Sequence, residues 1–386
     1  MSVLPSAPRG SWLVASRRVP LARKSLFEDR RRAGLALLGV SGGLLLVLVM
    51  SALFAGFTHQ ATAYFDRSPA DVVVSQAGVR SMQMSTSSVA AGTIDDVRQQ
   101  PGVAWVESLR QANTTITGPG SATLISYVFG YDVGTGRGGP QRLSTGRPPR
   151  NGQIVIDAAG AGQLGVGVGD QVQVFGHGVE ISGLTTGLTS LGNTNAFMTS
   201  DTYALLAGPG TNYLLVGASP ETTPARLAAG LARDLPGVTV QSRAAFSAED
   251  AALVGDLYGD VIKTMRGIGF VIALALVALT LSAITTSNLR EYAVVQALGA
   301  TRARLAGVIA LQAVWAIVVA TAIATALTLL LARFVGVLAP NVELVVEPGA
   351  VLSTLLGALA IGAPAALLPL RRVLSVDPAT AYRTSS

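Results

Sequence analysis

Four long stretches without a charged side chain dominate the pattern of hydrophobic positions. They run from Ala33 onward, between Arg266 and Arg290, between Arg304 and Arg333, and between Glu347 and Arg371. A helix needs about 20 mainly apolar residues to cross the hydrocarbon core of a bilayer. The pattern predicts a membrane protein with four transmembrane helices, at residues 33–57, 261–289, 305–333 and 348–370. The first stretch is too long for the apolar region of a typical signal peptide, so we expect it to be retained as an anchor.

The segment between the first two stretches, residues 58–260, has the pattern of a folded α+β domain. Runs of alternating or β-branched residues, which are typical of strands, occur at 71–76, 123–132, 153–157, 171–176, 179–184 and 213–219. Gly176-His177-Gly178 predicts a hairpin turn between the fourth and fifth runs. At 93–109 and again at 223–243, a helical pattern is followed by Pro-Gly-Val and then a strand, which indicates two similar helix–strand units in one lobe.

Both ends of this segment are expected to be helices that continue out of the bilayer as a stalk. Apolar residues recur there at steps of three and four, the spacing of one helix face. The residues expected to pack against each other are Phe57, Ala61 and Tyr64 at the first end and Val254, Tyr258, Val261 and Met265 at the second. The periodicity fits a force-bearing stalk and simple packing against the floor of the domain equally well.

Composition narrows the possible chemistry. The chain is 50% hydrophobic and 13% charged, with no cysteine and two histidines, which excludes disulfides and a thiolate zinc site and leaves no predicted metal site. No Walker A sequence is present, so the chain is not expected to bind ATP or another cofactor itself. Apart from the arginines at their ends, namely Arg266, Arg290, Arg304, Arg333 and Arg371, the four stretches contain no charge, which argues against a proton- or ion-coupled transporter. Only two lysines occur among 28 basic residues, which indicates a bacterium with a GC-rich genome.

The distribution of charge predicts the orientation, because basic residues concentrate on the cytoplasmic side of a membrane. Residues 1–32 hold eight basic side chains, and further arginines lie in the 290–304 loop and the 371–386 tail. The 334–347 loop has none, and residues 58–260 carry 11 basic against 16 acidic groups. We therefore expect a plasma-membrane protein with both termini in the cytoplasm and residues 58–260 outside.

The first 32 residues are expected to form a basic amphipathic helix in the membrane interface, and nucleic-acid binding is not expected. The basic side chains nearest the bilayer are Arg23, Lys24, Arg30, Arg31 and Arg32. Each such side chain near anionic head groups contributes about 1 kcal/mol to membrane binding.

The cytoplasmic loop before the third span contains a short helical pattern. It comprises Tyr292, Ala293, Val294, Val295, Gln296, Ala297 and Leu298, with Gly299 as a C-terminal stop and Thr301 as the next cap. A short helix beneath the membrane is suited to receive a push from a soluble partner. By spacing alone, a plain connecting loop fits equally well.

Residues 290–301, Arg-Glu-Tyr-Ala-Val-Val-Gln-Ala-Leu-Gly-Ala-Thr, resemble the signature of FtsX/MacB-like ABC transporter permeases. The basic start, the outer phrase GRPPRNGQIVIDAAGAGQLGVGVGDQVQV at 146–174, and Asp377-Pro378 with Ala381 and Arg383 near the end are also similar to that family. Gln296 and Tyr382 depart from the residues usual there. The resemblance covers essentially the whole chain.

The resemblance implies a homodimer paired with two copies of an ABC ATPase, which binds the ATP and Mg²⁺. The ATPase is expected to contact Arg290, Glu291, residues 292–299, Ala300, Thr301 and Arg302. Its closure would move the outer domain through the stalk, a process called mechanotransmission, without a tunnel through the membrane.

Three functions follow as hypotheses for this non-catalytic subunit. The first is export or release of a peptide, lipid or lipoprotein outside the membrane. The second is mechanical activation of an outer cell-wall hydrolase, so the outer partner would be an adaptor, a lipoprotein or a hydrolase. The third is a passive sensor anchored by four helices, which would need no ATPase.

Overall fold

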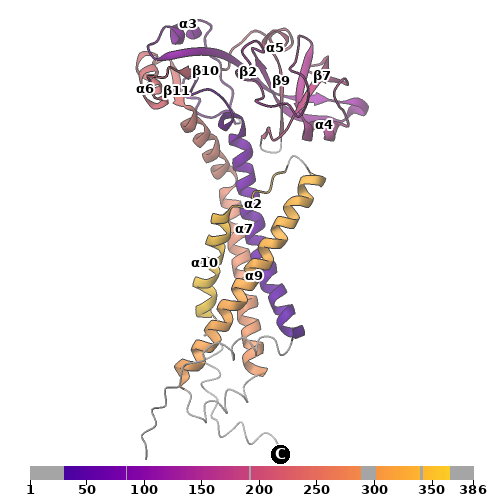
Figure 1. The fold of residues 1–386 in the computed structure, drawn as a ribbon, viewed down its shortest axis with the longest axis vertical. Helices are drawn as coiled ribbons and strands as arrows, with labels where there is room; N and C mark the ends of the chain where they lie inside the picture. The colour runs from indigo at the N-terminus through magenta and orange to yellow at the C-terminus, as the bar shows by residue number, and fades with distance from the viewer. Residues whose placement is uncertain (1–29, 84, 191–192, 288–300, 340–341, 366–386) are drawn as a thin grey trace, which may run out of the picture. The chain divides into compact units, whose positions relative to one another are not determined.

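The computed structural model describes residues 30–83, 85–190, 193–287, 301–339 and 342–365. Four long helices carry the apolar stretches (Figure 1): α2 (Arg30–Asp66), α7 (Arg243–Ser287), α9 (Arg302–Leu338) and α10 (Pro348–Ala365). Three of them are long and apolar enough to cross a membrane, at Leu37–Asp66, Arg243–Leu279 and Ala310–Leu338. The predicted fourth span is a shorter apolar helix in the part that the structure describes, since residues 366–370 lie outside it.

The helices extend further than the charge pattern predicts. α7 is one helix from Arg243 through the predicted stalk and span, and the portion without charge begins only after Arg266. α9 continues to Leu338, five residues past the predicted end of the third span. Within the described residues, helix therefore covers both the predicted spans and the predicted stalk.

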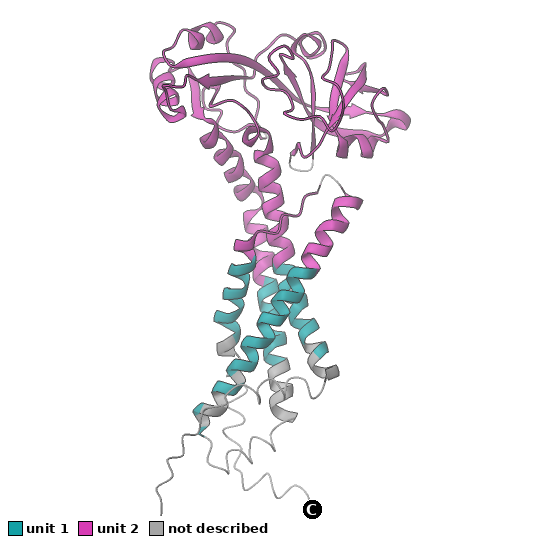
Figure 2. Ribbon diagram, viewed as in Figure 1, with its two compact units in different colours: residues 1–47, 268–326, 351–386 teal, residues 48–267, 327–350 magenta. Residues whose placement is uncertain are grey.

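The chain divides into two compact units, and each is described by itself (Figure 2). Unit 1 comprises residues 1–47, 268–326 and 351–386, and unit 2 comprises residues 48–267 and 327–350.

Unit 2 contains an 11-stranded sheet with small helices, as the α+β prediction requires. Its strands are β1 (Val72–Gln76), β2 (Val103–Thr117), β3 (Thr123–Tyr131), β4 (Thr145–Gly146), β5 (Gln153–Asp157), β6 (Gln171–Val174), β7 (His177–Thr185), β8 (Thr189–Ser190), β9 (Asn193–Thr199), β10 (Tyr213–Ala218) and β11 (Val238–Ser242). Between them lie α3 (Thr93–Arg98), a 3₁₀ turn (Pro119–Ser121), α4 (Ala158–Leu164), α5 (Ser200–Ala207) and α6 (Pro224–Asp234).

The strand order is β11-β1-β10-β2-β3-β9-β5-β7-β4, and β2 joins the two halves of this sheet. The first part of β2 pairs with β10 and the second part, from Arg110 to Thr117, pairs with β3. Most neighbours are antiparallel, whereas β3–β9 and β5–β7 are parallel. All six predicted strand runs are strands in the structure. β2 is longer than predicted. The prediction missed its second half because that half is largely polar and shows little hydrophobic alternation.

The two predicted helix–strand units pack together in one lobe. Val97 of α3 and Leu227 and Leu231 of α6 share a buried cluster with Val106 of β2 and Val216 of β10. A second cluster fills the other lobe with β5, β6, β7 and β9. The predicted hairpin between β6 and β7 is present, but its turn lies one residue earlier than predicted. Val174 pairs with His177, so Phe175 and Gly176 form the turn, with φ of 54° and 79°.

In unit 1, glycines let α2 and α7 approach closely. A Cβ built at Gly43 would lie 2.6 Å from the Ala273 nitrogen, and one built at Gly269 would lie 2.8 Å from a methyl carbon of Val47. Gly39 and Gly43 are four residues apart, the small-residue spacing that allows helix backbones to meet in membranes.

We expect Gly43→Ala to destabilise the full chain in detergent by about 1–3 kcal/mol, because the added methyl group overpacks the contact with α7. Gly42→Ala is the matched control, since a Cβ there meets no atom within 4 Å. Thermal unfolding of the two variants side by side checks this. Equal melting temperatures would contradict the close approach.

Candidate functional site

Most of the predicted cytoplasmic site lies outside the described residues. This holds for Arg23 and Lys24 and for Arg290 to Ala300. Thr301 is exposed and directly precedes α9, whose first residue is Arg302. Arg30, Arg31 and Arg32 begin α2. The residues that can be assembled into a site are therefore those where α2 and α7 enter the sheet of unit 2.

The predicted stalk residues fall into two groups. Ala61, Tyr64 and Val254 are buried, and the ring of Phe57 lies 5.2 Å from that of Tyr258. Val261 and Met265, predicted on the same packed face, are instead 60% and 39% exposed, and Ile262 is buried in their place. The prediction is wrong for these two because Val261 and Ile262 are adjacent apolar residues and steps of three and four both fit a helix face.

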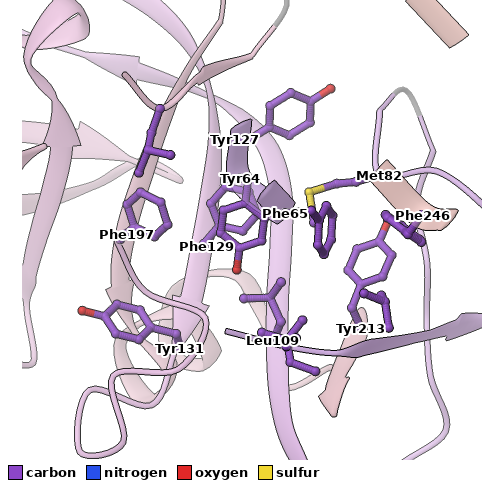
Figure 3. Close-up of a cluster of buried hydrophobic side chains, with 14 of the residues drawn as sticks. Tyr64, Phe65, Met82, Leu109, Tyr127, Phe129, Tyr131, Phe197, Tyr213 and Phe246 are labelled. Atoms are coloured by element: carbon purple, nitrogen blue, oxygen red, sulfur yellow. The ribbon is translucent and has the colours of Figure 1, made fainter. Parts of the chain in front are cut away.

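The end of α2 lies inside the core of unit 2 (Figure 3). The ring of Tyr64 stacks on Phe129 of β3, with centroids 4.6 Å apart and planes 3° apart, and lies 6.3 Å from Phe197 of β9. Its hydroxyl donates a hydrogen bond of 2.8 Å to the Gly138 carbonyl. Tyr64 thus fixes α2 to the lobe that contains β3 and β9.

The next residue, Phe65, fixes α2 to the other side of the core. Its ring lies 4.6 Å from Phe246 at the start of α7, and Phe246 lies 5.9 Å edge-on from Tyr213 of β10. Phe65 and Phe246 are 1% and 0% exposed. Close aromatic pairs contribute about 0.5–1.5 kcal/mol beyond their burial, so α2, α7 and β10 form one packed body.

Polar contacts tie the same helix ends. The Arg243 guanidinium donates to the carbonyls of Phe65 at 3.2 Å and Asp66 at 3.1 Å, the last residues of α2. A cation at this position satisfies free carbonyls and opposes the negative end of the helix dipole. The Ser247 hydroxyl donates to the Asp66 carboxylate at 2.8 Å. α7 therefore begins by capping α2.

Asp250, one turn further along α7, holds the segment after β1. Its Oδ1 accepts hydrogen bonds from the Ser81 hydroxyl at 2.6 Å, the Met82 nitrogen at 2.9 Å and the Gln83 nitrogen at 3.3 Å. Its Oδ2 has no hydrogen-bond partner among the described residues. Burial raises the pKa of the Asp250 carboxyl to about 6, the nearby Asp66 charge adds to the rise, and the three hydrogen bonds only partly oppose it.

Two further contacts reach α2 and the residue after it from the sheet domain. The Gln83 side chain donates to the Ala61 carbonyl at 3.1 Å, and the Arg67 guanidinium donates to the Gly187 carbonyl at 2.6 Å. Burial raises the pKa of the Asp157 carboxyl, and the hydrogen bonds from two backbone nitrogens and the nearby Arg67 charge only partly oppose the rise. Asp157 caps α4 through the Ala159 nitrogen and accepts from the Leu188 nitrogen.

These residues form a mechanical junction, which we call the helix–sheet joint. It comprises Tyr64, Phe65, Asp66, Phe129, Phe197, Tyr213, Arg243, Phe246, Ser247 and Asp250. Among the described residues, no group of three or more His, Cys, Asp or Glu side chains could hold a metal ion. Sequence reasoning found Tyr64 in this joint and missed the rest, although Phe65, a second aromatic residue next to Tyr64, was a visible signal.

Comparison with known proteins identifies the family. The family model for the MacB-like periplasmic core domain matches residues 33–234, and the model for the FtsX-like permease C-terminal region matches residues 264–378. The chain belongs to the FtsX/MacB-like ABC transporter permeases. Permeases of this family are membrane proteins with an extracellular domain. Membership in the family implies an ATPase partner, and the permease components of ABC transporters are generally non-catalytic.

Two curated proteins and one solved structure are similar to this permease. It is 28% identical to the "Uncharacterized ABC transporter permease" Rv2563 of Mycobacterium tuberculosis over 91% of this chain and 96% of that protein. The "Uncharacterized ABC transporter permease" Rv0072 of the same organism gives the same three values. The periplasmic region of MacB from Actinobacillus actinomycetemcomitans matches 47% of this chain and 92% of its own, with 12% identity and a TM-score of 0.37.

The raised pKa of Asp250 has a testable consequence for stability. The folded chain keeps the proton up to about pH 6, whereas the unfolded chain releases it near pH 3.9. The stabilisation is therefore present at low pH and is lost as the pH rises between these values, by on the order of 2–3 kcal/mol. We expect Asp250→Asn to remove this part of the pH dependence while keeping an oxygen for the three donors.

Denaturant unfolding of the full chain in detergent between pH 4 and pH 8, followed by tryptophan fluorescence, measures the effect. Asp256→Asn, on an exposed position of the same helix, is the control and is expected to retain the pH dependence of the unchanged chain. If the free energy of unfolding changed with pH in the same way for Asp250→Asn and for the control, the Asp250 carboxyl would not titrate as described.

Proposed function

We propose that this permease is a non-catalytic transmembrane subunit that converts ATP binding and hydrolysis by a partner ATPase into motion of its outer domain. The observation that carries the proposal is the helix–sheet joint. α2 and α7 are each a single helix, and both end in one buried core with the sheet. A displacement of either helix therefore moves the sheet as a body.

The proposed topology has four spans in a one-plus-three arrangement. Both termini and residues 290–304 lie in the cytoplasm, and residues 58–260 lie outside, as the distribution of arginine supports. Residues 290–302 are the proposed contact with two ATPase copies, which bind the ATP and Mg²⁺. The work done outside is export or release of a peptide, lipid or lipoprotein, and an adaptor, lipoprotein or hydrolase would be the outer partner.

A homodimer is supported by an exposed apolar stripe on α7. Leu257, Val261, Met265, Ile268 and Ile272 follow steps of four, four, three and four and are 39–60% exposed. The part of the stripe from Leu257 to Met265 is flanked by the charged residues Asp256, Asp260 and Lys263, so lipid is a poor partner for this part. A second copy of α7 would cover this stripe by the same apolar spacing.

Variants of the proposed ATPase contact test the coupling. We expect Glu291→Ala and Gly299→Leu each to weaken association with the ATPase by about fivefold or more, the effect of losing an important interface residue. Arg98→Ala, at an exposed residue pair in the outer domain, is the control and should bind normally. Co-purification and ATPase activity in nanodiscs provide the measurement. Unchanged values for all three variants would favour the passive anchor.

The absence of cysteine allows a direct test of the dimer. We expect Val261→Cys to form a disulfide-linked dimer under mild oxidation, because equivalent residues meet across a two-fold axis. Lys263→Cys is the control, since it is exposed but lies off the apolar stripe. Non-reducing gel electrophoresis of the membrane-embedded protein reports the yield. Equal yields at both positions would count against this interface.

A further inference from the structure

The segment between α9 and α10 lies against α2 within unit 2. We call residues 342–346 the strap. The Val345 nitrogen donates a hydrogen bond of 3.1 Å to the Ala52 carbonyl, and Glu343 Oε2 lies 2.9 Å from His59 Nδ1. The strap follows α9 closely, because the Ala339 nitrogen donates to Val335 and the Val342 nitrogen donates to Ala339. The strap is therefore attached to the end of α9 by hydrogen bonds as well as by the chain.

A glycine on α2 makes this contact possible. A Cβ built at Gly56 would lie 1.9 Å from the Glu343 carbonyl oxygen, so any other residue would push the strap away. Gly56 is buried in a helix interior, where glycine costs about 1 kcal/mol relative to alanine. The close approach of the strap gives a structural reason for glycine at this position.

The contacts form one stripe on α2. Ala52, Gly56 and His59 are four and three residues apart, which places them on one face of the helix. The strap runs antiparallel to α2, since the higher-numbered Val345 meets Ala52 and Glu343 meets Gly56 and His59. Two extended residues span about 6.6 Å, close to the 6 Å of four helical residues. The two segments therefore match in rise as well as in position.

α2 is the helix that most needs such a contact. The proposed ATPase-contacting segment lies between α7 and α9 in the chain, so α7 and α9 are joined to it directly. α2 carries Tyr64 and Phe65 into the sheet but has no covalent link to that segment. The strap gives α9 a path to α2 that does not run through α7.

We propose that the strap passes movement of α9 to α2, with Gly56 as the positioning residue that seats it. This role rests on the proposed function. Gly56→Val is expected to unseat the strap and to reduce the ATP-dependent displacement of the outer domain by at least half, while binding and hydrolysis by the ATPase are retained. Gly42→Val, on the same helix, is the matched control because no atom lies within 4 Å of its built Cβ.

Two measurements on the permease–ATPase complex in nanodiscs test this. The seating of the strap is read from the pair His59→Cys and Glu343→Cys in the cysteine-free chain, with a short thiol-specific cross-linker. Cross-linking is expected in the otherwise unchanged protein and is expected to fall at least fivefold with Gly56→Val. The displacement is read as the change in distance between spin labels at Arg98→Cys of the two copies when ATP is added.

The outcomes separate the strap from the proposed function. Loss of cross-linking with an undiminished change in distance would overturn the role of the strap. No change in distance in the otherwise unchanged complex would overturn the proposed function and with it the strap's role, whatever the cross-linking shows.

Val345→Pro is a second variant that leaves α2 unaltered and removes the backbone N–H that donates to the Ala52 carbonyl. It carries the test if Gly56→Val does not assemble, and the same reduction in displacement is expected. A full displacement with Val345→Pro and reduced cross-linking would again overturn the role of the strap.

Discussion

The burial of two adjacent aromatic side chains at the end of α2 is the interaction on which the rest of unit 2 depends. Tyr64 packs against Phe129 and Phe65 packs against Phe246, and these pairs belong to one core cluster. Burying a side chain of this size stabilises a protein by about 2–3 kcal/mol. Withdrawing α2 would expose both rings and open the core, whereas tilting α2 together with the sheet breaks none of these contacts. We therefore expect the motion of lowest energy to be one in which α2 and the sheet move together.

The polar contacts of the joint fix the positions of α2, α7 and the segment after β1 along one another, which aromatic packing alone leaves open. Ring stacking tolerates small slides, but Arg243 requires the last carbonyls of α2 and Asp250 requires the donors at Ser81, Met82 and Gln83. Among the described residues the Oδ2 of Asp250 has no hydrogen-bond partner, and burial raises the pKa of this carboxyl, so its specificity has a cost in stability at neutral pH. Buried polar groups that are retained despite such a cost are consistent with a role in holding one arrangement.

The sequence predicts the local part of this architecture well and the non-local part poorly. Long charge-free stretches and β-branched runs depend only on neighbours in the chain, so the helices and six strands could be read directly. The second half of β2 escaped prediction because its pairing with β3, rather than its own pattern, makes it a strand. Val261 and Ile262 could not be told apart, since the direction from which α2 approaches α7 decides which is buried. Arg243 and Asp250 were invisible as a joint because their partners lie more than 160 residues earlier.

The joint also explains why a contact as small as the strap can matter. α2 and α7 cannot slide past one another at their upper ends, because Phe65 packs on Phe246 and Arg243 caps α2. A push on α7 alone would therefore act to one side of the sheet, which both helices support. Part of the resulting movement would then be a rotation of the sheet. A contact that brings α9 onto α2 at Gly56 applies force to the second support as well. We expect two supports driven together to translate the sheet and one driven support to turn it, so under the proposed role of the strap the seating of residues 342–346 would determine which motion the outer domain makes.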